Sequence, residues 1–330
     1  MPLPIFTIIV PIYNVGEWLR PCLNSILSQT FLEWEAILVD DGSNDGSEAI
    51  CDEYAHLDSR FRVTHQVNQG VAVARNTGLK TALGEWIWCV DADDVIHPEA
   101  LRVLSAFTED CCKYNIVYFD FINDTKINFP SLNGKEPQEY IEINPKIPEM
   151  SAWRYVFKKQ LLGDLRFFQY RVGEDLLFSA KLCSKSDSVV HLSLPLYGYV
   201  IRGTSVTKNP TLLTIQDSIR WMSDVLPVYA ADDRFLHVYK HRWRMFLFIL
   251  PMKIRVFSGS EYIALSRLWL EKLEAIQELP GGMIYRIWRG IIVNAYQFSF
   301  ALGRLFFAIN AMIGKWYLNA RHIRRSVSLI

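Results

Sequence analysis

Short apolar runs alternate with helix-forming segments along the first hundred residues. Four runs have the length and the β-branched or aromatic content of buried strands, IFTIIVPIYN, WEAILVDD, FRVTHQV and EWIWCV. The segments between them place apolar side chains at helical spacing, as in EWLRPCLNSILSQ. Strands and helices that alternate at this interval predict right-handed crossovers and a parallel sheet covered by helices on both faces. We therefore expect an α/β fold that binds ligands at the carboxyl ends of its strands.

The rest of the chain is less regular. The segment CCKYNIVYFDFIND predicts a further strand, and residues 129–151 form a stretch rich in Pro and Asn. The segment SAWRYVFKKQLL then predicts a helix with Ser151 as its N-cap. After about residue 212 the sequence becomes helical and aromatic.

Composition excludes several classes of protein. The chain has 35 basic and 35 acidic residues, so no net charge attracts it to nucleic acid. Its six cysteines include no CxxC pair, which predicts reduced core thiols of a cytosolic protein rather than a disulfide framework. The apolar run before Pro11 is shorter than a signal peptide's hydrophobic segment, and we expect neither a signal peptide nor a membrane span there.

Polar side chains gather at the predicted carboxyl ends of the four strands, at residues 11–14, 40–43, 68–70 and 91–94. Each cluster alone is compatible with ordinary turn chemistry. Together, at one edge of a sheet, they outline a crevice with hydrogen-bond acceptors for a base and a ribose. Arg75, on the helix after the third strand, is available to a phosphate.

Three aspartates lie within four residues after the fourth strand, Asp91, Asp93 and Asp94. Carboxylates this close repel one another, so the cluster predicts a positive partner. If the extended backbone continues to residue 93, Asp91 and Asp93 point to the same side, where two hard oxygen ligands suit Mg²⁺ or Mn²⁺. The alternative is a helix start with Asp93 or Asp94 as N-cap, and we expect Asp94 to take that role.

Five motifs together resemble the family 2 glycosyltransferases, which have the GT-A fold, and specifically their bacterial cell-surface polysaccharide branch. The motifs are PIYN at 11–14, SILSQT at 25–30, VDDGSNDGS at 39–47, NQGVAVARNTGL at 68–79 and VDADD at 90–94. The resemblance is dense to about residue 110 and continues as short matches to about residue 210. It implies a Rossmann-like, mostly parallel central sheet with helices on both faces, and the sequence after it predicts a helical C-terminal region.

The same resemblance implies a division of the chain by function. Residues 1–110 would form the half that binds a nucleotide sugar. Residues 111–212 would form the acceptor side of the same domain and supply the catalytic base. Residues 213–330 lie beyond the resemblance, and their own pattern predicts a helical region with basic amphipathic helices.

Residues of the first motifs would bind the nucleotide of a UDP-sugar donor. By resemblance, Pro11 and Tyr13 would line the uridine pocket, and Asp41 would accept a hydrogen bond from the uracil ring. Asn68 and Arg75 would flank the nucleotide.

The last motif would bind a metal ion. Asp91, with Ala92 beside it in the donor site, would reach the ribose or the metal. Asp93 would be the principal ligand of a Mn²⁺ or Mg²⁺ ion next to the diphosphate.

Two acids in YRVGEDLLFSAKLC resemble the family's Glu-Asp motif, whose aspartate acts as the base in inverting transfer. This implies Asp175 as the base, with Glu174 contacting acceptor or sugar hydroxyls. The alternative is that two acids at a helix N-terminus only favour the helix dipole. Further on, Arg202, aided by Ser205, would pair with the departing diphosphate, unless it is a surface arginine on an edge strand.

The C-terminal region is basic and amphipathic. Residues 281–330 contain seven Lys or Arg and no Asp or Glu. On a helical wheel, residues 284–316 place apolar side chains on one side and basic ones opposite. This face can pack on the catalytic domain or lie on an anionic membrane. With a lipid-linked acceptor implied by the family, we expect membrane contact.

The sequence thus predicts a metal-dependent, inverting glycosyltransferase that uses a UDP-sugar and a lipid-linked glycan acceptor at the inner face of the cytoplasmic membrane. One alternative is a nucleotidyltransferase of related architecture, although PIYNVGEWLR lacks the Gly-rich basic loop usual in such enzymes. Another is a non-catalytic, nucleotide-sugar-binding subunit of a polysaccharide assembly complex. The intact set of Asp91, Asp93 and Asp175 argues against that alternative.

Overall fold

The computed structural model describes residues 3–108, 113–132, 137–142, 147–148, 150–201, 211–246, 250–254 and 259–275. The chain divides into two compact units. The first contains residues 1–169 and 174–205, and the second contains residues 170–173 and 206–330.

The predicted alternation of strands and helices forms one half of the first unit. Strands β1 (Phe6–Ile12), β2 (Trp34–Asp40), β3 (Phe61–His65) and β4 (Trp86–Cys89) are parallel, in the spatial order β3-β2-β1-β4. The connections are α1 (Leu19–Leu27, preceded by the 3₁₀ turn Gly16–Trp18), α2 (Ser47–Leu57) and α3 (Val71–Thr81). All four residues of β4 are buried because the strand lies inside the sheet, between β1 and β8.

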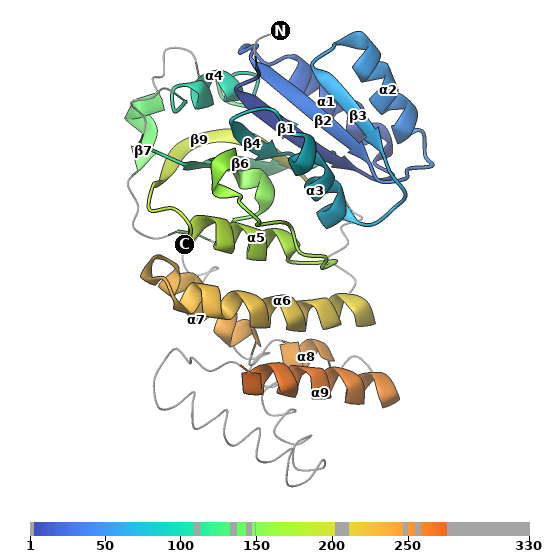
Figure 1. Cartoon of the computed structure of the whole chain (residues 1–330), viewed down its shortest axis with the longest axis vertical. Coiled ribbons are helices and arrows are strands. Elements are labelled where there is room, and N and C mark those ends of the chain that lie inside the picture. The colour runs from blue at the N-terminus through green and yellow to red at the C-terminus, as the bar shows by residue number, and fades with distance from the viewer. Residues whose placement is uncertain are drawn as a thin grey trace, which may run out of the picture. The chain divides into compact units, whose positions relative to one another are not determined.

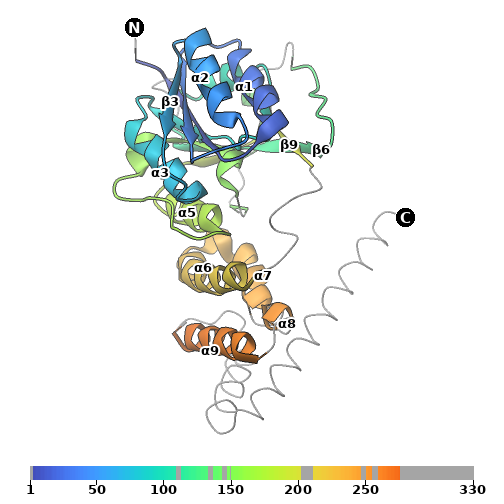
Figure 2. The ribbon, with the colours of Figure 1, turned by 90° about the vertical axis from the view of Figure 1, so that its right-hand side faces the viewer.

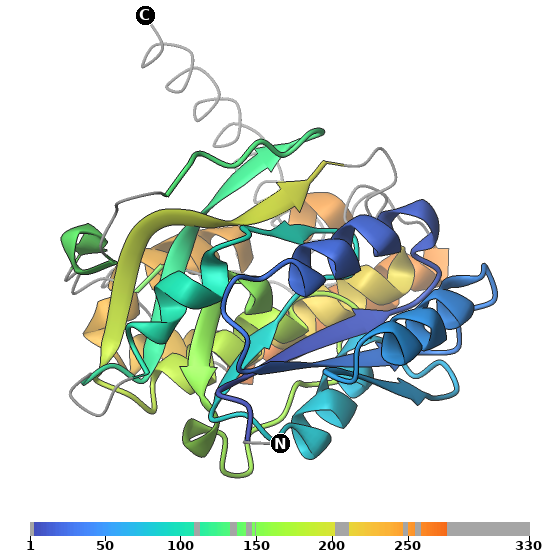
Figure 3. The same ribbon diagram turned by 90° about the horizontal axis from the view of Figure 1, so that it is seen from above.

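Mixed strands extend the sheet beyond β4. Strand β8 (Tyr155–Lys158) is antiparallel to both β4 and β6 (Ile116–Asp124), and β6 runs parallel to β9 (Val189–Val200). The short strands β5 (Val95–Ile96) and β7 (Ile141–Glu142) pair antiparallel with β9. Figure 3 shows β9 curving along the sheet, and the register between β6 and β9 shifts around Asp120. The parallel half thus ends at β4, where the mixed half begins.

Helices cover both faces of this sheet (Figures 1 and 2). Alternate residues of β1, including Ile8 and Val10, pack in one buried cluster with α1, α2 and α4 (Ala100–Ser105). The opposite face carries α3 and α5 (Glu174–Cys183), with Ile9 of β1 against Gly78 of α3. The expected mostly parallel α/β sheet with helices on both faces is therefore confirmed.

Residues 151–162 do not form the predicted helix. Ala152–Arg154 make a 3₁₀ turn, Tyr155–Lys158 form β8, and Lys159–Leu161 make a second 3₁₀ turn. The side chain of Ser151 caps nothing. The helical reading fails because this segment fills a gap between β4 and β6, where ladders on both sides satisfy its backbone.

The described part of the second unit is helical, and α6 begins at Leu212, where the sequence changes character. Its elements are α6 (Leu212–Ala230), a 3₁₀ turn (Asp233–Phe235), α7 (Leu236–Arg244), α8 (Leu250–Ile254) and α9 (Gly259–Ala275). Residues 170–173 belong to this unit, and the backbone N–H and guanidinium of Arg171 donate to the buried carboxylate of Asp217 on α6. Within the described ranges, no helix is both long and apolar enough to cross a bilayer. The basic amphipathic segment predicted at 281–330 lies outside the described residues.

We expect Gly78→Ala to destabilise the first unit, although Gly→Ala in a helix normally stabilises. An added Cβ would lie 2.4 Å from Cγ2 of Ile9. Overpacking of this kind costs about 1–3 kcal/mol, against a helix gain of about 1 kcal/mol. Urea unfolding measures the difference, with the exposed Lys80→Ala on the same helix as control. A Gly78→Ala variant more stable than wild type would contradict the tight α3–β1 contact.

Candidate functional site

The loops after β1 and β2 are joined into one rim at the carboxyl edge of the sheet. The backbone N–H of Asn14 donates to Oγ of Ser43 at 3.1 Å, and the next two N–H groups donate to Oγ of Ser47 at 3.2 Å. Asn14 has a φ of 49°, a left-handed conformation that Asn tolerates better than most residues. Beside it Tyr13 is 52% exposed, and Pro11 is half-buried on β1. The predicted uridine-pocket residues therefore lie at the expected edge, with the Tyr13 ring accessible.

Asp41 organises the loop after β3. Its buried carboxylate accepts hydrogen bonds from Nε2 of Gln66 at 2.7 Å, from N of Gln69 at 2.9 Å and from N of Gly70 at 2.8 Å. Asn68 is exposed within the loop that these bonds fix. A contact between Asp41 and uracil stays a prediction, because three protein donors already bind this carboxylate.

The aspartate cluster after β4 is a turn. The strand ends at Cys89, and the N–H of Asp94 donates to the carbonyl of Asp91 at 3.1 Å. The assumption that an extended backbone continues to residue 93 is therefore wrong, since Ala92 and Asp93 are the central residues of this turn. Asp91 and Asp93 are nevertheless both partly exposed, whereas Ala92 between them is buried.

Asp94 does not cap the following helix. Helix α4 begins at Ala100, and the buried Asp94 carboxylate accepts from the Tyr197 hydroxyl at 2.7 Å and from N of Val200 at 2.8 Å. The Tyr197 oxygen also accepts from the N–H of Asp91 at 3.2 Å, so one side chain of β9 holds both ends of the turn. Sequence reasoning gave Tyr197 no role. The sequence did contain a signal for such a role, because a tyrosine among the alternating apolar residues of PLYGYV is expected to be buried and to need a hydrogen-bond partner.

The turn carries an excess of negative charge. Burial raises the pKa of Asp94 to about 7, and the nearby Asp91 carboxylate adds to this effect. Accessible carboxylate oxygens in such a field fit a hard cation such as Mg²⁺ or Mn²⁺, which takes one or two carboxylates and completes its shell with phosphate oxygens and water. Within the ranges that the structure describes, no three His, Cys, Asp or Glu side chains form a ready-made metal site.

Arg75 joins this turn to the paired acids of α5. Its guanidinium is 4% exposed and donates to Oδ1 of Asp91 at 2.9 Å and to Oε1 of Glu174 at 2.8 Å. The two carboxylates keep Arg75 charged and raise its pKa although burial opposes this. Direct contact with a phosphate stays a prediction, because both terminal nitrogens already bind carboxylates.

The two acids of α5 have different surroundings. Glu174 is buried and paired with Arg75, whereas Asp175 is partly exposed. Desolvation and the adjacent Glu174 charge raise the pKa of Asp175 to about 7, although Arg75 acts in the opposite direction. Asp175 is therefore poised to exchange a proton near neutral pH. Arg202 and Ser205 lie outside the described residues.

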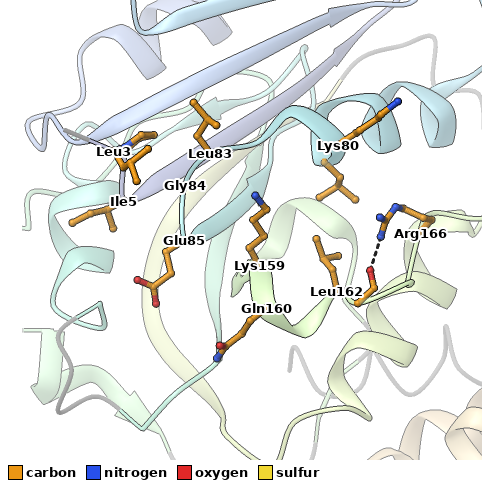
Figure 4. Close-up of a pocket in the computed structure, with 13 residues that line it drawn as sticks. Leu3, Ile5, Lys80, Leu83, Gly84, Glu85, Lys159, Gln160, Leu162 and Arg166 are labelled. Atoms are coloured by element: carbon orange, nitrogen blue, oxygen red, sulfur yellow. Dashed lines mark hydrogen bonds between the residues drawn. The ribbon is translucent and has the colours of Figure 1, made fainter. Parts of the chain in front are cut away.

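A cavity of about 830 Å³ lies at the opposite edge of the sheet, beside the amino ends of β1 and β4 (Figure 4). Two of its basic groups bond to backbone carbonyls: Nζ of Lys159 donates to the carbonyl of Ala82 at 2.6 Å, and Arg166 donates to that of Gly163 at 2.9 Å. Because ligands of such sheets bind at the carboxyl edge, we do not assign the donor to this cavity.

The fold is that of known GT-A glycosyltransferases. The structure matches that of Staphylococcus aureus TarS residues 1–349 in complex with UDP-GlcNAc at a TM-score of 0.70, with 20% identity over 96% of this chain and 92% of that one. A mannosyltransferase from Pyrobaculum calidifontis, in complex with GDP-Man and Mn²⁺, matches at 0.51, with 16% identity over 95% of this chain and 88% of that one.

The sequence identifies the family. Residues 7–166 match the model of glycosyl transferase family 2, so this part of the chain is a domain of that family. The chain is also similar to the glycosyltransferase GlyA of Streptococcus pneumoniae, with 33% identity over 219 residues. The aligned region covers 61% of this chain and 31% of GlyA. The chain thus spans less than a third of the length of that curated relative. The expected family and fold are both confirmed.

We expect Arg75→Met to destabilise the protein by about 3–5 kcal/mol, because it leaves carboxylates without their buried partner. Adding Glu174→Gln should recover part of that loss, since the double variant no longer buries the Glu174 charge. Urea unfolding of the single and double variants measures the coupling. The control is Arg20→Met, which removes the exposed pair with Glu53 and should change stability little. Equal losses in the Arg75 and Arg20 variants would contradict the buried bridge.

Proposed function

We propose that this protein is a metal-dependent, inverting glycosyltransferase that moves a sugar from a UDP-sugar to a hydroxyl group of a glycan acceptor in bacterial cell-surface polysaccharide synthesis. The observation that carries the proposal is the buried bridge from Asp91 through Arg75 to Glu174. It holds the aspartate turn and the acids of α5 at one edge of a sheet of this family.

Donor binding is assigned to the rim of loops after β1, β2 and β3. Tyr13 offers an exposed aromatic face to the base, and Asn68 offers an exposed amide. Asp41 would act mainly by fixing the loop from Gln66 to Gly70. The UDP-GlcNAc bound to TarS, which has the same fold, supports a UDP-sugar as donor.

The aspartate turn is assigned to the cation. Asp91 and Asp93 would hold Mn²⁺ or Mg²⁺, which when bound offsets negative charge on the departing diphosphate. The Mn²⁺ in the mannosyltransferase of similar fold supports this choice. Arg75 orients Asp91 through the 2.9 Å ion pair.

Asp175 is assigned as the base. It would take the proton of the acceptor hydroxyl while the hydroxyl oxygen attacks the anomeric carbon and UDP leaves from the opposite face. Two observations favour it over Glu174: it is the more exposed of the two acids, and Arg75 already neutralises Glu174. The negative charge of Glu174 would then help to raise the pKa of Asp175. Arg202 remains the proposed partner of the departing diphosphate.

The acceptor is assigned as a lipid-linked glycan, reached at the inner face of the cytoplasmic membrane. The support is the basic amphipathic sequence of residues 281–330, which has seven basic and no acidic residues.

We expect Asp93→Asn to abolish Mn²⁺-dependent binding of UDP and to leave the fold intact, because the substitution removes a charged oxygen ligand. Calorimetry of UDP with and without Mn²⁺ measures this, and Asp164→Asn at an exposed position is the control. UDP affinity that depends on Mn²⁺ as in wild type would exclude Asp93 as a ligand.

We expect Asp175→Asn to lower kcat by at least about 100-fold with donor affinity nearly unchanged, since a general base contributes about 10²–10⁴-fold. UDP release from UDP-GlcNAc, UDP-glucose and UDP-galactose with Mn²⁺ measures turnover, and calorimetry measures binding.

The pH profile of the wild-type protein tests the same assignment. A base with a pKa raised to about 7 is protonated below that pH, so the rate should rise as pH increases through 7 and then level off. Asp175→Asn should lose this limb. Wild-type turnover in the variant would move the base elsewhere, and a wild-type protein that binds UDP-sugars without turnover would favour a binding subunit.

A further inference from the structure

Asn76 holds the backbone of the segment that precedes α5. Its Nδ2 donates to the carbonyl of Phe167 at 2.9 Å, and its Oδ1 accepts from the N–H of Phe167 at 2.8 Å. The amide thus satisfies both backbone polar groups of one residue that lies 91 positions further along the chain. Two bonds to one residue fix both its distance from α3 and its orientation.

Phe167 passes this constraint to α5. Its ring is buried and stacks on Phe178, with centroids 3.8 Å apart and planes 10° apart. On the side of α3, the Arg75 guanidinium lies 5.3 Å from the centroid of the Phe167 ring. The Phe167 ring is therefore packed against α5 while its backbone is bonded to α3.

The contacts on α5 are spaced to set the rotation of the helix. Glu174, which binds Arg75, and Phe178, which stacks on Phe167, are four residues apart and lie on one face. Two consecutive residues of α3 therefore support this face at points one helical turn apart. Arg75 binds Glu174 directly, and Asn76 acts on Phe178 through Phe167. Asp175 follows Glu174 directly, so its direction depends on how the face is held.

We propose that Asn76 is a positioning residue, which, through Phe167, fixes the rotation of α5 and thereby the place of the Asp175 carboxylate. This inference rests on the proposed function, because it takes Asp175 as the base. Asn76 itself touches neither donor nor acceptor in this assignment. Without Asn76, Phe167 loses both of its backbone hydrogen bonds to α3, and the face of α5 that carries Glu174 and Phe178 loses this support.

Asn76→Ala tests the proposal. We expect kcat for UDP release from the UDP-sugar that turns over fastest to fall at least tenfold, with the Kd for UDP and Mn²⁺ within about twofold of wild type, as for a loss of transition-state positioning alone. The acidic limb of the pH profile should also shift, because rotation of α5 moves Asp175 relative to Arg75 on α3, which lowers its pKa. The matched control is Asn24→Ala, which removes an interhelical hydrogen bond with Tyr54 at 2.6 Å and should keep wild-type kcat.

A second variant keeps the proposal falsifiable if Asn76→Ala does not fold. Phe167→Leu retains the backbone bonds to Asn76 but removes the ring stack, and we expect the same selective loss of kcat. Wild-type kcat in either folded variant would overturn the proposal, as would equal losses in the Asn24 and Asn76 variants. A wild-type protein without turnover on any nucleotide sugar would instead overturn the proposed function.

Discussion

The buried guanidinium of Arg75 is the interaction on which the candidate site depends. It binds carboxylates from two segments far apart in sequence, Asp91 after β4 and Glu174 at the start of α5. Glu174 could not lie at this depth without a counter-charge, because an unpaired buried carboxylate is costly. Arg75 therefore lets the aspartate turn and the acids of α5 lie at the same edge of the sheet. Desolvation and the adjacent Glu174 raise the pKa of Asp175 in this region, against the effect of Arg75.

Hydrogen bonds between loops complete the rest of the site. Asp41 ties the loop after β3 to β2, Ser47 ties the loop after β1 to α2, and Tyr197 of β9 holds the aspartate turn from the mixed half of the sheet. The side chains proposed to bind ligands, such as Tyr13, Asn68 and Asp93, are thus at least partly exposed, whereas Asp41, Ser47 and Tyr197, which fix their loops, are buried. Arg75 and Asn76 both lie on α3, so this helix contacts the aspartate turn and, through Glu174 and Phe167, the side of α5 that carries the proposed base.

Sequence patterns predicted the parallel half well because the apolar pattern of each segment agreed with the burial of its residues in the fold. The strand WIWC is apolar throughout and is buried throughout. Patterns failed where a neighbour distant in sequence decides the conformation. Tyr155–Lys158 form a strand because the backbone groups of β4 and β6 pair with this segment on both sides. Asp94 became an internal acceptor because Tyr197 and Val200 of β9 reach it before the next helix begins.

The sequence by itself determined the family, the alternating fold and the edge of the sheet where polar groups gather, since these follow from periodicity, composition and motif order. Only the tertiary structure decided how the charges are shared. Arg75 was expected at a phosphate, yet its hydrogen bonds go to Asp91 and Glu174, and this separates a buried Glu174 from a more exposed Asp175. The physical reason is that ionic and hydrogen-bond partners are chosen by proximity in three dimensions, which local sequence patterns do not encode.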